Sequence, residues 1–302
     1  MKHILFFVVL LFVVSAATGQ TATSVQKATS FAGKPLYLKV PDAKVLAKSD
    51  SVIASIKSKG KLKEDDYVEI GKQYVATTRY QEAIDLYTKG LAKFPQSYKI
   101  LRNRGHRYLT LRQVDKALAD LTKAEKLVRT QPDVMEFGLD GKPTATVRHQ
   151  IWYHIGVSNY LMGNYAKAVA AFEQAVATGG DLKNVVGASD WLYNSSQRAG
   201  DKDKAAKTIA SITPDLDTDR DNVYFRRIML YKGVIKPEEL VDVTIAPEKM
   251  TIQDVTKMYG LANWYSYNGD KQKANSLYKI IISSPDAWPG WAYAGAEKDV
   301  VN

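Results

Sequence analysis

The residue types that most often carry catalysis are present in this chain, but their spacing builds no reactive site. Besides His3, the histidines are His106, His149 and His154. His149 and His154 are five residues apart, so on one helix they would point about 140 degrees away from each other and could not share a metal ion. The sequence has no nucleophile-elbow, zinc-protease or phosphate-loop motif. We therefore expect no enzyme activity, no catalytic residues, no metal and no cofactor.

The charged clusters have structural explanations. The carboxylate pairs Asp65-Asp66 and Glu238-Glu239 stand at expected helix starts, where they favour the helix dipole. Arg104 occupies a position where helix packing calls for an apolar residue. We expect it to form a structural ion pair with a buried partner such as Asp120.

The elements that would position a site repeat at a fixed interval. Residues Gly71, Tyr74, Ala83, Tyr87 and Gly90 recur 34 positions later as Gly105, Tyr108, Ala117, Leu121 and Ala124. This is the period of a two-helix unit, which stacks on its neighbours because one pair cannot bury its apolar face alone. Small residues at Gly71 and Ala83 would let the two helices approach closely, and Pro95 would end the second helix.

These residues and spacings resemble the tetratricopeptide repeat. A third unit carries Trp152, Ile155, Gly156, Ala168, Phe172 and Ala175; weaker units surround Leu192, Ala205 and Ile209, and Leu261, Ala262, Tyr265, Ala274 and Tyr278. The stretches 102–108 and 151–156, with an insertion between them, look like an uncharacterised subgroup of exported bacterial tetratricopeptide proteins. The resemblance implies an all-α fold, a right-handed α-α solenoid of helix pairs.

The repeat pattern also predicts the domain organisation. We expect a signal peptide at 1–19, a tether at 20–40, an N-terminal helix at 41–60, repeats one and two at 64–131, an insertion at 132–148, repeats three, four and an irregular pair at 149–254, and a last repeat with a C-terminal cap at 255–302. Gly233 and Pro237 would break the irregular pair. In the cap, Trp288, Trp291 and Tyr293 would cover the exposed end of the last unit.

The insertion carries apolar residues around Asp140-Gly141, which is a hairpin turn signal, and Pro143 interrupts one side. We expect an irregular segment or a short hairpin that packs beside the groove of the solenoid as a flap and contributes to binding.

The amino terminus predicts export. Lys2 and His3 precede an apolar run at 4–14 and small residues up to Gly19, the order of a signal peptide cleaved near Gly19. The chain has no cysteine, which excludes disulfides and suits an oxidising compartment. We expect a periplasmic or secreted protein.

The net charge of +10 favours anionic partners. The lysines are scattered and form no stripe with interleaved aromatic residues, so we expect no nucleic acid. An anionic envelope surface is an alternative partner.

The family resemblance implies that the first helix of each pair lines the groove. The side chains expected to face it are Lys99, Arg102, His106, Tyr153, Tyr160, Asn194, Gln197, Tyr259 and Asn263. Arg102 would bind carboxylates, the tyrosines would stack and the amides would pair with a peptide main chain.

The leading hypothesis is a non-catalytic exported adaptor that binds a protein or peptide segment in this groove. The alternative is an envelope carbohydrate or anionic-surface binder, with Tyr153, Tyr160, Tyr259 and Trp264 stacking on sugar rings. A hydrolase with a site assembled from distant helices is the third, least favoured hypothesis.

Overall fold

The computed structural model describes residues 24–301, so the predicted signal peptide at 1–19 lies outside the described residues. This part of the chain is mostly helical, with two short β-hairpins. The helices are α1 (Ala43–Lys57), α2 (Glu64–Ala76), α3 (Tyr80–Lys93), α4 (Tyr98–Thr110), α5 (Val114–Val128), α6 (Val147–Leu161), α7 (Tyr165–Ala177), α8 (Leu182–Arg198), α9 (Lys202–Ile209), α10 (Val223–Tyr231), α11 (Pro237–Leu240), α12 (Ile252–Tyr267), α13 (Lys271–Ile282) and α14 (Trp291–Val301). None of them is long and apolar enough to cross a membrane.

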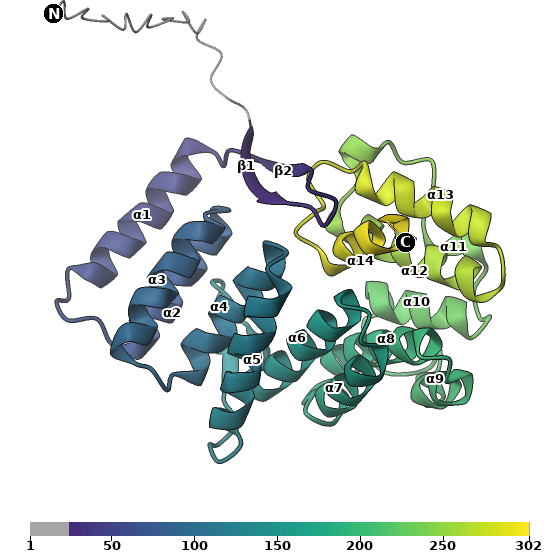
Figure 1. Ribbon diagram of the computed structural model, residues 1–302, viewed down its shortest axis with the longest axis horizontal. Helices are drawn as coiled ribbons and strands as arrows, with labels where there is room; N and C mark the ends of the chain where they lie inside the picture. Colours follow the sequence, from purple (N-terminus) through teal and green to yellow (C-terminus); the bar gives the residue numbers. More distant parts are fainter. Residues whose placement is uncertain (1–23, 302) are drawn as a thin grey trace, which may run out of the picture.

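Consecutive helices pack in pairs, and the pairs follow one another along an arc from α1 to α13 (Figure 1). The pairs are α2 with α3, α4 with α5, α6 with α7, α8 with α9, and α12 with α13. The predicted solenoid of tetratricopeptide-type helix pairs is therefore confirmed.

Close approach within a pair explains why small residues recur at the repeat period. A Cβ atom added to Gly156 on α6 would lie 2.7 Å from the ring of Phe172 on α7. At Gly71 the same atom would lie 2.2 Å from Tyr87. Each glycine makes room for the aromatic ring of the second helix, and this contact sets the distance between the helices.

The helices between α9 and α12 are short and irregular. Helix α10 ends at Tyr231, and Gly233 adopts a positive φ of 70° before the one-turn helix α11 begins at Pro237. Helix α10 packs between α8 and α12 and so continues the row of first helices.

The predicted tether at 20–40 is wrong for its described part. Strands β1 (Ser24–Thr29) and β2 (Pro35–Lys39) form an antiparallel hairpin that lies between the two ends of the arc (Figure 1). Leu36 and Leu38 are buried in the main core, and the indole Nε1 of Trp288 donates a hydrogen bond to the carbonyl of Tyr37 at 2.7 Å. The segment is ordered because its partner lies near the opposite end of the chain, outside the reach of local sequence patterns.

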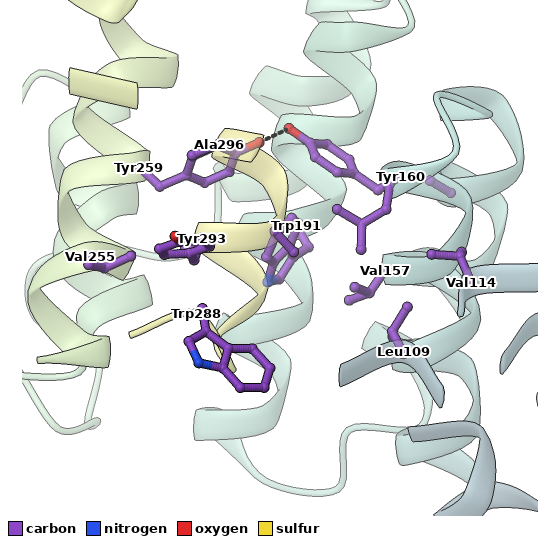
Figure 2. Close-up of a cluster of buried hydrophobic side chains, with 14 of the residues drawn as sticks. Leu109, Val114, Val157, Tyr160, Trp191, Val255, Tyr259, Trp288, Tyr293 and Ala296 are labelled. Carbon is purple, nitrogen blue, oxygen red and sulfur yellow. Dashed lines mark hydrogen bonds between the residues drawn. The ribbon is translucent and has the colours of Figure 1, made fainter. Parts of the chain in front are cut away.

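The C-terminal segment does more than cap the last unit, which corrects the prediction for 255–302. Helix α14 packs on α12 and α13, but it also crosses the inside of the arc to contact α6. Figure 2 shows Tyr293 and Ala296 of this helix, with Trp288 before it, beside Trp191, Val157 and Tyr160. The chain's own last helix thus fills part of the inner face.

A buried ion pair fixes this helix to the first half of the chain. The Nε atom of Arg112, in the turn between α4 and α5, lies 3.0 Å from Oε2 of Glu297 on α14. Its Nη2 atom donates to the carbonyl of Trp288 at 2.8 Å, and Glu297 also accepts from the backbone N–H of Phe31 at 3.3 Å. Arg112 has a φ of 65°, the left-handed region that Gly163, Gly200 and Gly269 occupy in other helix-pair turns. The side chain that replaces glycine here offsets the strain by linking three distant segments.

We expect Glu297→Gln to lower the free energy of unfolding by about 3 to 5 kcal/mol, because it leaves a buried guanidinium without a counter-charge. Urea denaturation measures the change. The matched control is Glu173→Gln, which breaks an exposed pair with Lys204 and should cost less than about 1 kcal/mol. Equal losses in the two variants would show that the buried pair does not hold α14.

Candidate binding groove on the inner face

Three neighbouring cavities follow the inner face of the arc, where the first helix of each pair is exposed. The first lies between α2, α4 and the insertion and measures 390 Å³; the second lies beside it and also measures 390 Å³; the third lies between α6, α8, α10 and α12 and measures 320 Å³. The first two share Lys72, Glu136 and Phe137, and the second and third share Gln150. We call this row of cavities the concave groove.

The insertion forms one wall of the groove. Strands β3 (Met135–Phe137) and β4 (Pro143–Thr146) pair as an antiparallel ribbon, as the Asp140-Gly141 turn predicts. Lys72 on α2 donates to the carbonyl of Phe137 at 3.0 Å, and Arg102 on α4 forms an ion pair with Glu136. These contacts hold the ribbon beside the groove in the position expected of a flap.

The first cavity carries both signs of charge. Asp65, Asp66 and Glu69 lie on α2, and the ammonium of Lys99 on α4 lies 2.7 Å from a carboxylate oxygen of Asp65. Since both side chains of this pair reach water, the pair adds little to stability and leaves Lys99 accessible to a ligand.

The third cavity is lined by aromatic and amide side chains. The hydroxyls of Tyr153 on α6 and Tyr224 on α10 lie 3.4 Å apart, and Asn222 accepts hydrogen bonds from the first backbone N–H groups of α10. Gln150 and Gln253 make no side-chain hydrogen bond with another described residue. Their amide groups can therefore pair with a ligand at no cost to the fold.

The structure separates the predicted groove residues into two sets. Lys99, Arg102, His106 and Tyr153 line the concave groove. The remaining predicted residues, Tyr160, Asn194, Gln197, Tyr259 and Asn263, do not line these cavities.

Four residues of the second set belong to the interior, which corrects their expected role, whereas Gln197 is half-buried and donates to the hydroxyl of Tyr193 at 3.1 Å. Tyr160 and Tyr259 share a hydroxyl hydrogen bond of 3.0 Å beside α14 (Figure 2), and Tyr259 donates to Asp299. Asn194 and Asn263 are fully buried and bond each other at 3.0 Å. Tyr160 and Tyr259 are buried because α14 packs where an open trough was expected, and Asn194 is enclosed by residues of α10 and α12. Burial also removes Tyr160 and Tyr259 as stacking platforms for a sugar.

Several groove residues have no clear signal in the sequence. Tyr224 and Asn222 belong to the irregular pair, where the repeat pattern is lost, and Gln150 precedes the recognisable part of the third unit. Arg107 lies five residues after Arg102, so simple helical spacing places it on another face.

Arg104 pairs with Asp120 at 2.7 Å, which confirms its predicted structural role.

The histidines of the described part of the chain are His106, His149 and His154. No group of His, Cys, Asp or Glu within residues 24–301 could hold a metal ion. The rings of His106 and His154 lie 4.1 Å apart between centroids, and Trp291 of α14 packs on both. Burial lowers the pKa of each ring well below 6.5, and the nearby cations Arg107 and Arg102 lower it further.

We expect the protein to lose stability as the pH falls below 6.5. In the unfolded chain both rings bind protons there, whereas in the folded protein they stay neutral, so each contributes a slope of up to about 1.4 kcal/mol per pH unit. Urea denaturation at pH 7 and pH 5 measures it. The double variant His106→Gln/His154→Gln should show a flatter dependence, and an unchanged slope would contradict this prediction.

Comparison with known proteins locates one repeat directly. Residues 150–178 match the family model for the tetratricopeptide repeat, and they cover most of α6 and all of α7. No curated protein matches the chain.

Several solved structures superpose on most of the chain at low sequence identity. A tetratricopeptide repeat protein from Parabacteroides merdae is 16% identical, with 80% of this chain and 86% of that one covered at a TM-score of 0.47. YrrB, a TPR protein with an unusual peptide-binding site, is 14% identical, with 76% and 90% covered at 0.43. MamA is 16% identical, with 71% and 94% covered at 0.41. The match at 150–178 identifies α6 and α7 as one tetratricopeptide repeat, and the other helix pairs of the chain have the same two-helix arrangement.

Proposed function

We propose that this protein is a non-catalytic adaptor that binds an extended segment of another protein in the concave groove. Helical solenoids present extended concave surfaces, and the tetratricopeptide fold suits the chain to protein–protein contacts. The observation that carries the proposal is the continuity of the groove, since each cavity shares lining residues with the next and together they extend from α2 to α12.

The chemistry of the groove favours a polypeptide. Gln150 and Gln253 offer amide donors and acceptors that match a peptide main chain, and Tyr153 and Tyr224 offer rigid aromatic surface with polar tips. The exposed rings and alkyl groups of Phe137 and Leu139 on the ribbon can cover apolar side chains of the same segment.

Helix α14 supports the same conclusion. It is a polypeptide segment that already packs against first helices of the arc, with Trp291 beside His106 and His154 and Asp299 bonded to Tyr259. The inner face therefore accepts a peptide at its covered end, and the groove is the part that remains open.

We also propose that the chain is exported and cleaved near Gly19. The charged start, the apolar run and the small residues before Gln20 support this, and the absence of cysteine is compatible with it. A partner would then be a protein of the envelope or the exterior.

Photocrosslinking tests the adaptor function. With p-benzoylphenylalanine at Gln150, we expect capture of specific polypeptides in the cell envelope, and the companion change Tyr224→Ala should reduce it because it removes the aromatic wall. The matched control is the same probe at Lys123, an exposed position on α5. Equal capture from both positions would contradict the proposal, and capture of glycan in place of protein would favour the carbohydrate hypothesis.

Export has its own test. We expect the protein from the envelope or medium fraction to begin at Gln20 when its N-terminus is sequenced. A chain that keeps residues 1–19 and remains in the cytoplasmic fraction would show that this part of the proposal is wrong.

A further inference from the structure

The second cavity contains a buried cation without a counter-ion. Among the described residues four arginines are buried, and three of them have carboxylate partners: Arg102 with Glu136, Arg112 with Glu297, and Arg227 with Asp190. Arg107 on α4 is 9% exposed, and its guanidinium makes no ion pair or hydrogen bond with another described residue. The Cζ atom of Arg107 lies over the ring of Tyr80, 5.7 Å from its centroid.

The open side of this guanidinium faces the cavity. Arg107 lines the second cavity, and its nitrogens are not among the unpaired polar atoms that are sealed from solvent. Burial lowers the pKa of Arg107, which reflects the cost of holding a charge there. An unpaired buried charge costs several kcal/mol, so a ligand that pairs with it recovers a large free energy.

The rest of the cavity defines the ligand. Lys72, Arg102 and Arg107 are its cations, and Glu136 is its one carboxylate among the described residues. The remaining lining includes the apolar groups of Val75, Phe137 and Leu139. This combination matches a carboxylate flanked by apolar side chains.

We propose that the second cavity is a binding site for a carboxylate of the partner segment, with Arg107 as its main ligand-binding residue. This deepens the adaptor function proposed above and rests on it. Glu136 of the ribbon already occupies Arg102 as an internal carboxylate, so the site has one engaged arginine and one free arginine. The partner's carboxylate pairs with the free one, and its apolar neighbours contact the ribbon.

Binding of three short peptides to the full-length chain tests the site. The first is acetylated and amidated with a central Phe-Glu-Leu; the second carries Gln in place of Glu; the third ends in a free carboxylate after Phe. We expect the first to bind roughly tenfold more tightly than the second in calorimetry, since it adds a charge-assisted pair. Tighter binding of the third than of the first would identify a chain terminus as the natural anion.

The variant Arg107→Gln should abolish the preference for Glu over Gln, and Glu136→Gln should increase it by freeing Arg102. Lys207→Gln, which removes an exposed charge on α9, is the matched control and should change nothing. Equal binding of the Glu and Gln peptides to the natural protein, or no binding of either, would overturn the proposal.

Thermal unfolding of the variant Arg107→Met distinguishes a loss of binding from a loss of folding. Replacement of an unpaired buried charge by an apolar side chain should leave the Tm unchanged or raise it. A fall of the Tm with loss of helicity would assign Arg107 a structural role and overturn the site. If the protein does not prefer the Glu peptide but crosslinking from Gln150 captures specific polypeptides, the anion site is wrong and the adaptor function stands. If the protein prefers the Glu peptide but crosslinking captures no polypeptide, the anion site stands and the adaptor function is wrong.

Discussion

The ion pair between Arg112 and Glu297 is the contact that joins the last helix of this solenoid to its first half. Stacked helix pairs touch only their neighbours, so a solenoid has no intrinsic link between its ends. Here a guanidinium in the second pair binds a carboxylate on the last helix, and the hairpin at 24–39 packs against the same region. Because both charges are almost fully buried, this link is strong only while both partners are present.

This link places α14 on the inner face and so divides that face into a filled part and an open part. Helix α14 covers the middle and C-terminal parts of α6 and α12, where Tyr160 and Tyr259 meet, and Trp291 closes the space beside His106 and His154. The N-terminal ends of α6, α8, α10 and α12 stay free and line the third cavity. The accessible groove therefore runs along one edge of the first helices.

Charge is distributed according to the same division. In the filled part, cations are neutralised inside the chain: Arg227 pairs with Asp190 at 2.9 Å, and Arg198 pairs with Asp299 at 2.8 Å. In the open part, Glu136 on the ribbon reaches Arg102 while Arg107 has no such partner. The positive charge of the chain thus has a local excess at the second cavity, where Lys72, Arg102 and Arg107 face the single carboxylate of Glu136 among the lining residues.

The sequence by itself determined the helix pairs, because Gly71, Gly105 and Gly156 each meet a larger side chain of the second helix at a fixed local spacing. It also determined the Arg104–Asp120 pair and the turn of the ribbon, which depend on residues close in the chain. Only the tertiary structure decided which of the nine predicted groove residues are accessible. Phe31, Arg112 and Glu297 come together across most of the chain length, and no local periodicity records a contact between such distant residues.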